Sequence, residues 1–280
     1  MISASPAALP AALAPWPWPP LLRTSVLLHA AAAGAALAIP GAGAWALAGV
    51  VLNHAVLTAA GLWPRSRLLG PNLTRLPGAG PDVALTLDDG PDPQTTPAVL
   101  ALLAAHGVRA TFFCIAERAR AHPALLREIV AHGHSVQNHS LHHRHDFSLL
   151  GPRALERDIS AAQDLLAGLA GVRPHCFRAP AGLRNPFLDP VLHRLGLQLV
   201  SWTRRGFDTR DADPQRVLAR LSRRLAAGDI LLLHDGHARR SAAGHAVLLD
   251  VLPPLLERCR TAGLRAVTLH DAVPPRHARP

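Results

Sequence analysis

The sequence contains no lysine and no tyrosine, so all 29 of its basic residues are arginine. Aromatic residues make up only 4% of the chain, and the formal net charge is +10. Domains that bind nucleic acid usually gather their basic residues into a stripe and interleave aromatic side chains that stack on bases. Here the arginines are scattered and stacking partners are scarce. The charge therefore reflects a chain-wide bias of composition, and we expect no nucleic-acid partner.

Cysteine is also scarce, with only Cys114, Cys176 and Cys259, which lie far apart in the sequence. An odd number of cysteines without a Cys-x-x-Cys pair indicates neither a disulfide framework nor a thiolate metal site, so we expect buried free thiols. The length of 280 residues is enough for one large domain with a short appendage, because roughly 200 residues already bury a core well. Nothing in the sequence indicates an oligomeric state.

Charged residues are missing between Arg23 and Arg65, where the sequence is mostly Ala, Leu, Val and Gly. This composition is typical of membrane-embedded sequence. Pro40 and Gly41 interrupt the run, which leaves residues 24–39, marginally short for a span, and residues 41–63, which are long enough. One pass and two passes are both compatible with these lengths. A cleavable signal peptide fits poorly, because the first 22 residues contain no basic residue.

We therefore predict a hydrophobic, membrane-embedded segment over residues 1–70, which contacts the membrane through residues 24–63, and a catalytic domain over residues 71–280. The membrane would be a bacterial inner membrane. If the segment is a hairpin, Arg23 at one end and Arg65 at the other place the catalytic domain in the cytoplasm. A single pass leaves the side undecided. The alternative is an Ala-rich helical pair packed on a soluble domain, but the segment lacks the polar stripe of a surface helix.

From residue 83 onward, short apolar runs alternate with amphipathic helical stretches, which predicts an α/β fold with a mostly parallel sheet. Seven strands are expected, over residues 83–87, 110–115, 134–138, 175–178, 197–202, 229–233 and 264–268. Helices are expected between them, with clear patterns over residues 96–106, 123–132, 153–169, 213–225 and 246–262.

Polar residues capable of chemistry follow the predicted strands, at the end where barrel enzymes carry their active sites. They come from five different strands and are Asp88, Asp89, His139, Arg178, Asp208 and His234. Solubility alone would not place polar residues so regularly at strand ends. We therefore expect these side chains to meet in one site.

The spacing of these residues indicates a metal-dependent hydrolase. His139 and His143 are four residues apart, so on a helical turn they would share a face and reach one cation. Two imidazoles and one carboxylate are the usual ligands of a catalytic zinc with an open water position. Of Asp88 and Asp89, one would bind this divalent ion and the other would accept a proton from water. The plainer alternatives are a solvated Asp-Gly turn and a His-rich surface loop.

His234 emerges from an apolar strand at the same end of the sheet, which makes it the best candidate for the acid that protonates the leaving amine. The plainer alternative is a buried core histidine. Four more histidines, His142, His145, His237 and His245, are expected to be bystanders, because a closed ligand set would leave no position for water.

In these residues the chain resembles the polysaccharide deacetylase family, carbohydrate esterase family four, which includes chitin, chitooligosaccharide and peptidoglycan deacetylases. Five ordered blocks between Val83 and Thr268 carry the resemblance. TLDDGP is similar to the family's TFDDGP, HSLHH to its His-Ser/Thr-x-x-His, RAPAG to its RPPYG, the region around Asp208 to its Asp-Trp block, and LLLH to its LxLH. Each block is weakly specific by itself, but five in order are strongly specific.

The resemblance implies a distorted (β/α)7 barrel and a role for each matching residue. The implied catalytic residues are Asp88 as base, His234 as acid, Arg178 orienting Asp88, and Asp208 tuning His234. The implied metal ligands are Asp89, His139 and His143, and the metal would be one divalent ion, foremost Zn²⁺. The backbone amide of Ala181 would stabilise the oxyanion, and Leu232 would line the substrate pocket. Asp211 and Asp213 lie close enough to compete with Asp208 for its role.

Two departures from the family pattern concern the pocket. Ala181 stands where the family has Tyr, and Thr209 stands where it has the Trp of the Asp-Trp block. A backbone donor survives a side-chain change, so the machinery would remain while the glycan and the acyl group stay undefined. We expect hydrolysis of an N-acyl amide, foremost N-acetyl, on an amino sugar of a polysaccharide, oligosaccharide or glycolipid. The alternatives are deformylation or deacylation of a lipid-carrier-linked amino sugar, and a catalytically idle, membrane-anchored glycan-binding module.

Overall fold

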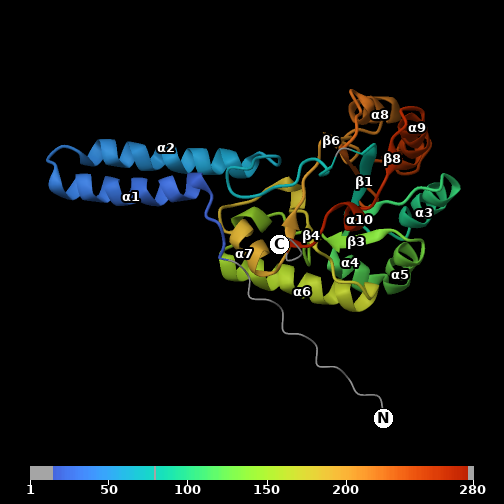
Figure 1. Ribbon diagram of the computed structural model, residues 1–280, viewed down its shortest axis with the longest axis horizontal. Coiled ribbons are helices and arrows are strands. Elements are labelled where there is room, and N and C mark those ends of the chain that lie inside the picture. The colour runs from blue at the N-terminus through green and yellow to red at the C-terminus, as the bar shows by residue number, and fades with distance from the viewer. Residues whose placement is uncertain (1–14, 79, 277–280) are drawn as a thin grey trace, which may run out of the picture.

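The computed structural model describes residues 15–78 and 80–276, which form a long helical hairpin and an α/β domain (Figure 1). The hairpin consists of α1 (Pro20–Ala38) and α2 (Gly43–Leu62), which lie side by side and project away from the domain. Proline at the first position of α1 suits a helix start, and Gly41, with φ of +82°, supplies the left-handed residue of the turn. The first fourteen residues of the predicted N-terminal segment lie outside the described residues.

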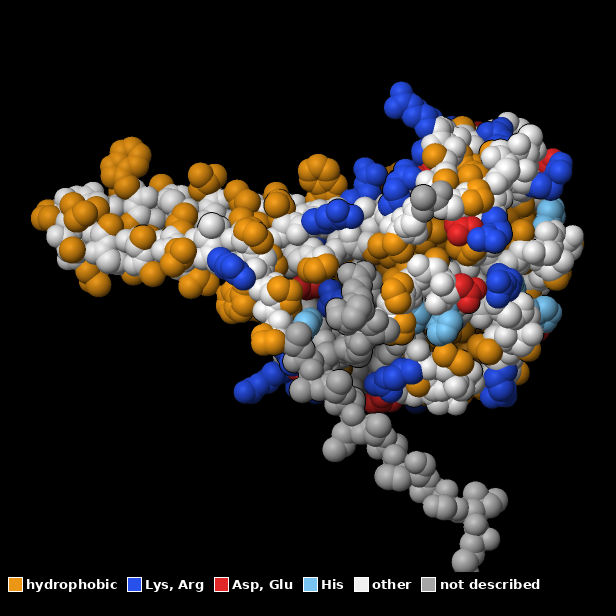
Figure 2. All heavy atoms as spheres, viewed as in Figure 1, with side chains coloured by type: hydrophobic (Ala, Val, Ile, Leu, Met, Phe, Trp, Pro, Cys, Tyr) orange, Lys and Arg blue, Asp and Glu red, His pale blue; other side chains and the backbone are white. Residues whose placement is uncertain are grey.

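The hairpin exposes apolar side chains along most of its length (Figure 2). Leu37 is 90% exposed and Trp45 is 82% exposed, and the most apolar windows of the two helices are only 11% and 22% buried. Both helices are long and apolar enough to cross a membrane by length and composition. A pair of helices packed over the domain would bury such residues, so this alternative does not describe the hairpin. Membrane insertion itself remains a prediction.

The domain is built on a sheet in which every pairing is parallel. Its strands run in the order β5-β4-β3-β2-β1-β7-β6, with β8 paired to the start of β1. They are β1 (Asp82–Asp88), β2 (Thr111–Cys114), β3 (Ser135–Asn138), β4 (Cys176–Phe177), β5 (Gln198–Leu199), β6 (Arg204–Arg205), β7 (Ile230–His234) and β8 (Arg265–Ala266). The edge strands β5 and β6 are not paired to each other in the described residues, so the sheet is a curled half-barrel rather than a closed barrel. The predicted parallel α/β architecture of the (β/α)7 type is confirmed.

Helices pack around the outside of the sheet (Figure 1). They are α3 (Thr96–Ala105), α4 (Ala116–Ala121), α5 (Pro123–Ala131), α6 (Pro152–Ala170), α7 (Leu188–Arg194), α8 (Pro214–Ser222), α9 (Val247–Thr261) and α10 (Leu269–Ala272). Several begin with proline at or next to their first position, and Asp213 caps α8 by accepting from the Gln215 amide at 2.8 Å. The short helices α4, α7 and α10 were not among the helices predicted by residue range.

The alternation of side chains along β1 separates the core from the site. Leu85 and Leu87 point outward into the cluster beneath the helices, and burying each contributes roughly 1.5–3 kcal/mol. Thr86 and Asp88 consequently point to the inner face of the curl, where Ala84 joins a second, smaller cluster. Strand β1 thus carries its carboxylate into the hollow of the half-barrel. As expected, the three cysteines are buried and free.

Candidate active site

Seven of the nine predicted site residues line one cavity of about 190 Å³ at the carboxyl ends of the strands. Strand β1 and the turn after it supply Asp88 and Asp89, and β7 supplies His234. The other residues that line it are His139, His143, Ala181, Gly182, Trp202, Arg205, Thr209, Leu232 and His237. Arg178 and Asp208 lie behind this wall, and each contacts a lining residue. The structure therefore brings together all nine residues predicted from the sequence.

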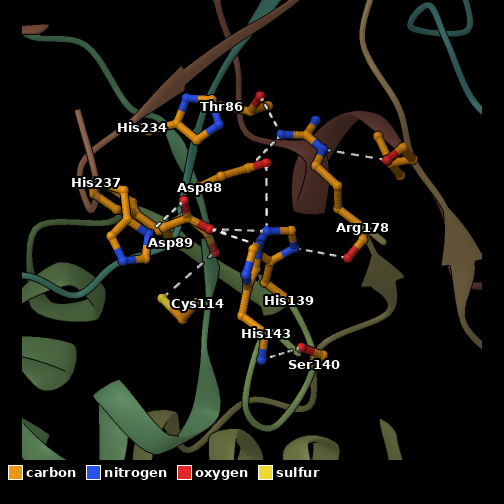
Figure 3. Close-up of polar contacts among 12 residues, drawn as sticks. Thr86, Asp88, Asp89, Cys114, His139, Ser140, His143, Arg178, His234 and His237 are labelled. Carbon is orange, nitrogen blue, oxygen red and sulfur yellow. Dashed lines mark hydrogen bonds and ion pairs between the residues drawn. The ribbon is translucent and has the colours of Figure 1, made fainter. Parts of the chain in front are cut away.

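One oxygen of Asp89 faces two imidazoles, as Figure 3 shows. Oδ1 of Asp89 lies 3.3 Å from Nε2 of His139 and 3.2 Å from Nε2 of His143. This oxygen is buried and has no hydrogen-bond partner in the described residues, although buried carboxylate oxygens are normally satisfied. One potential ligand atom from each of the three residues lies within 4.8 Å of the others. The donor set and the orphaned oxygen fit one divalent cation.

The loop that presents the two histidines is not the helical turn that their spacing suggested. Residues 139–144 have no helical hydrogen-bond pattern, and Ser140 and His143 have φ of +70° and +51°. The hydroxyl of Ser140 accepts from the His143 amide at 2.9 Å, which stabilises the strained loop. The ring centroids of the histidines come within 5.0 Å through this loop conformation. His139 and His143 were thus predicted correctly to converge, but the predicted helical turn was wrong.

The orientation of His139 is fixed by a backbone carbonyl. Nδ1 of His139 lies 2.8 Å from the carbonyl oxygen of Arg178. A carbonyl only accepts, so Nδ1 carries a proton and Nε2 is the ring nitrogen that faces Asp89. A hydrogen bond of this kind is the usual device for orienting a metal-binding imidazole.

The electrostatics of the three residues agree with cation binding. Burial alone would lower the pKa of His139, but the charges of Asp88 and Asp89 raise it. The pKa of His143 falls to about 4, chiefly through burial and then through the neighbouring His139, so His143 is neutral at pH 7. Burial would raise the pKa of Asp89, but the neighbouring imidazoles of His139 and His237 lower it well below its ordinary value, and it stays ionised. The site therefore offers a carboxylate and a neutral imidazole within a negative potential.

Asp88 is held by an arginine rather than by the histidine pair. Nη1 of Arg178 donates to Oδ1 of Asp88 at 2.6 Å, and the other oxygen of Asp88 lies 3.8 Å from Nε2 of His139. Arg178 is only 1% exposed, and it also donates to the hydroxyl of Thr86 at 2.8 Å and to the carbonyl of Ser201 at 2.9 Å. Burial lowers the pKa of Arg178, and Asp88 partly offsets this effect. Asp88 is thereby kept as a fixed carboxylate beside the cavity.

His234 is oriented by Asp208, which contacts its ring. The two oxygens of Asp208 accept from Nδ1 of His234 at 2.9 Å and from its backbone amide at 2.7 Å. Burial alone would lower the pKa of His234, but the charge of Asp208 and the hydrogen bond to it raise the pKa above its ordinary value. Of the competing acids, Asp211 pairs with Arg216 and Asp213 caps α8. Only Asp208 contacts His234.

His237 was expected to be a bystander, and the structure corrects this. Its Nδ1 lies 3.1 Å from Oδ2 of Asp89, and its Nε2 lies 2.5 Å from Nη2 of Arg118. A guanidinium only donates, so Nε2 accepts and Nδ1 carries the proton toward Asp89. Arg118 also donates to the carbonyl of Asp89 at 2.9 Å. The other three histidines expected to be bystanders do not line this cavity.

The sequence feature that could have indicated the role of His237 is the preceding glycine, Gly236, which passes close to the Asp89 backbone. Gly236 lies in the turn between His234 and His237. A Cβ at this glycine would lie 2.5 Å from the carbonyl oxygen of Asp89. His237 itself is in the left-handed region with φ of +65°. The turn therefore folds back over Asp89, which spacing alone could not reveal.

The two positions that depart from the expected pattern both lie on the cavity. Ala181 has φ of +54° within the turn Pro180–Gly182, and Thr209 and Leu232 line the same cavity. Trp202 contributes an aromatic wall, and the guanidinium of Arg205 stacks over its ring at 5.3 Å. The cavity thus keeps an aromatic and a cationic surface despite lacking both expected aromatic residues.

Comparisons with known proteins agree with this geometry. The family model described as polysaccharide deacetylase matches residues 76–200. A peptidoglycan-N-acetylglucosamine deacetylase of Bacillus cereus is 34% identical over 198 residues, which cover 70% of this chain and 89% of that protein. A chitooligosaccharide deacetylase of Sinorhizobium fredii is 40% identical over 162 residues, covering 56% and 73%. The solved structure of a family 4 carbohydrate esterase from Streptomyces lividans in complex with acetate is 32% identical, with a TM-score of 0.62 over 69% of this chain and 97% of that one.

Proposed function

The chain belongs to the polysaccharide deacetylase family, and from this premise we propose that it hydrolyses the N-acetyl amide of an amino sugar in a metal-dependent reaction. The observation that carries the proposal is the convergence of Asp89, His139 and His143 around an orphaned carboxylate oxygen. Asp88 and His234 lie on the same cavity and supply two different acid–base groups. The products would be a carboxylate, acetate, and a free sugar amine.

Three residues would hold the cation, namely Asp89, His139 and His143. A divalent ion such as Zn²⁺ would polarise the amide carbonyl and lower the pKa of water from 15.7 to about 7. His237, itself held by Arg118, would orient Asp89 by donating to Oδ2, which leaves Oδ1 for the ion. Because His237 would act on the ion only through Asp89, it would be a positioning residue.

Asp88 would take the proton from the attacking water as the new C–O bond forms. Arg178 would hold the Asp88 side chain in the orientation that faces the cavity. The backbone N–H of Ala181 would stabilise the negative oxygen of the tetrahedral intermediate, with Leu232 packing near the acyl group. His234, charged through its contact with Asp208, would then protonate the amine as the C–N bond breaks.

We also propose that the domain from residue 71 onward is tethered to the inner membrane by the hairpin. Both ends of the hairpin lie beside the domain, and Arg23 and Arg65 stand near these ends. The positive-inside rule then places the catalytic domain in the cytoplasm. A reporter fused after Thr268 tests this topology: a cytoplasmic reporter signal supports it, whereas an active periplasmic reporter contradicts it.

The activity test is acetate release from a panel of soluble and lipid-linked N-acyl sugars, with and without added divalent metal. Wild type is expected to release acetate only with metal, and Asp88→Asn should reduce the rate by about 10² to 10⁴. Release of formate instead would favour the deformylase alternative. The idle glycan-binding alternative would be favoured if the protein bound no stoichiometric metal and His139→Ala changed nothing.

A further inference from the structure

A second cavity, of about 730 Å³, lies where the hairpin meets the catalytic domain. Its volume is within the roughly 300–1,000 Å³ that is usual for small-molecule sites. One wall comes from the hairpin and the chain before it, through Trp18, Leu22 and Leu57. The other comes from two loops of the domain, through Leu149 and Phe187. The lining is mostly apolar, so the cavity suits a hydrocarbon ligand.

The apolar side chains at this cavity are unusually exposed. Leu149 is 83% exposed, Phe187 is 49% exposed and Trp18 is 48% exposed. They extend the apolar surface of the hairpin onto the domain. Contiguous exposed apolar surface of this kind marks a site of interaction with an apolar partner.

The cavity is held in shape by specific contacts between the hairpin and the domain. Nε1 of Trp16 donates to Oδ2 of Asp189 at 2.7 Å, and the amide of Arg184 donates to the carbonyl of Gly61 at 3.2 Å. A Cβ at Gly61 would lie 2.2 Å from the Arg184 carbonyl oxygen, so only glycine permits this approach. The two walls are therefore fixed relative to each other.

A third, smaller cavity lies between the apolar cavity and the candidate active-site cavity and shares lining residues with both. Its volume is about 50 Å³. It shares His143 and Ala181 with the candidate active-site cavity and Ser148 with the apolar cavity. The two larger cavities are therefore neighbours, near enough for the polar and apolar parts of one ligand to be considered together.

We infer that the apolar cavity binds the hydrocarbon chain of a membrane glycolipid, whose N-acyl sugar reaches the candidate active-site cavity. The inference rests on the proposed function and narrows its substrate class. The occupant is a lipid rather than a peptide because one wall belongs to helices whose apolar length suits a bilayer. Trp18, Arg23 and Trp63 cluster at the ends of the helices next to the domain, as residues do at a membrane surface. A chain leaving the bilayer at this level enters the cavity directly.

The first test compares two substrates in full-length protein reconstituted in phospholipid nanodiscs. They are a long-chain alkyl glycoside and the methyl glycoside of N-acetylglucosamine. Because each buried methylene adds binding energy, kcat/KM should be at least about tenfold higher for the long-chain substrate. Phe187→Glu and Leu149→Glu should abolish this preference and leave turnover of the methyl glycoside unchanged. Val172→Glu is the matched control, since Val172 is 51% exposed and lies outside the cavity. Equal kcat/KM for both substrates would overturn the inference.

The second test does not depend on turnover. The same alkyl glycoside carrying a diazirine at the end of its chain is photoactivated in the nanodiscs, and labelled peptides are mapped by mass spectrometry. Labelling of residues 147–150 and 184–190, competed by unlabelled alkyl glycoside and reduced in Phe187→Glu, supports the inference. Labels confined to the bilayer-facing residues of α1 and α2, or not competed by the glycoside, show that bulk lipid alone fills the cavity and refute it. If neither substrate were hydrolysed, the proposed function would be contradicted. The labelling would still show whether the alkyl chain occupies the apolar cavity.

Discussion

The guanidinium of Arg178 donates to Oδ1 of Asp88 at 2.6 Å, and both side chains are almost completely buried. The same guanidinium lies 4.0 Å over the ring of Phe113 and reaches the hydroxyl of Thr86. A lone carboxylate in such a place would be strongly penalised by desolvation. The pair thus holds Asp88 apart from the two imidazoles that face Asp89, so the two adjacent acids can serve different purposes.

Replacing Arg178 should affect stability as well as activity. Arg178→Met would leave the Asp88 carboxylate buried and unpaired, and removal of one partner of a buried pair costs about 3–5 kcal/mol. Arg178→Lys should recover only part of this loss, because an ammonium cannot reproduce the planar fork that reaches Asp88, Thr86 and Ser201. Urea denaturation followed by tryptophan fluorescence measures both values. An unfolding free energy unchanged in Arg178→Met would contradict this role.

The Asp208–His234 contact predicts a change in the pH dependence of turnover. Asp208 is the main cause that raises the pKa of His234 against burial, so His234 remains a proton donor to higher pH. In Asp208→Asn this support is removed, and the alkaline limb of the kcat/KM profile should move to lower pH. Activity at pH 8 should fall at least about tenfold relative to the activity of the same variant at its optimum. An alkaline limb at the wild-type position would argue against His234 as the acid.

His237 should control metal affinity through Asp89. His237→Ala removes the donor to Oδ2 of Asp89, and losses of outer contacts of this kind weaken metal binding by about 10- to 100-fold. His237→Asn keeps an N–H at a position similar to Nδ1 and should restore most of the affinity. Competition with a chromophoric chelator measures the Kd of each protein. Equal losses in the alanine and asparagine variants would indicate a purely structural contribution.

His134 provides a pH test of stability away from the candidate active site. Its Nδ1 accepts from the Ala110 amide at 3.1 Å, and burial, followed by the charges of His132 and Arg109, lowers its pKa from 6.5 to about 4. In the unfolded chain His134 binds a proton once the pH falls below 6.5. In the folded chain it binds one only when the pH falls to about 4. The contribution of neutral His134 to the free energy of unfolding is therefore complete above pH 6.5. It is lost as the pH falls toward 4, by up to about 3 kcal/mol.

The variant that checks this expectation is His134→Asn, which keeps an acceptor and does not titrate. The difference in unfolding free energy between wild type and His134→Asn should change between pH 6.5 and pH 4. His106→Asn, at an exposed histidine, is the control. A constant difference over this pH range would refute the expected proton uptake.

Much of the site could be predicted because its residues stand at the ends of strongly patterned strands. Asp88 follows an apolar run, and His234 ends one, so the parallel sheet alone brings them together. His139 and His143 were predicted to converge, but through a helical turn. The actual loop needs left-handed residues at Ser140 and His143, which no apolar periodicity predicts.

Features made by contacts between distant segments could not be predicted. Strand β6 consists of Arg204 and Arg205 alone, and the Arg205 guanidinium stacks on Trp202 and on Phe207, so no apolar alternation reveals it. The contact of His237 with Asp89 requires Gly236 to pass close to the Asp89 backbone. The hairpin helices were predicted from composition, whereas the apolar cavity at their base depends on loops more than 80 residues further along the chain.

The most direct measurement of the central claim is a calorimetric titration of Zn²⁺ into metal-free protein. Wild type should bind one zinc ion per chain, and Asp88→Asn should bind it with similar affinity, because Asp88 is held by Arg178 rather than by the ion. His139→Ala and His143→Ala should each weaken binding by at least about 100-fold, since each loses one of three ligands. If both alanine variants bound zinc as tightly as wild type, Asp89, His139 and His143 would not form the metal site.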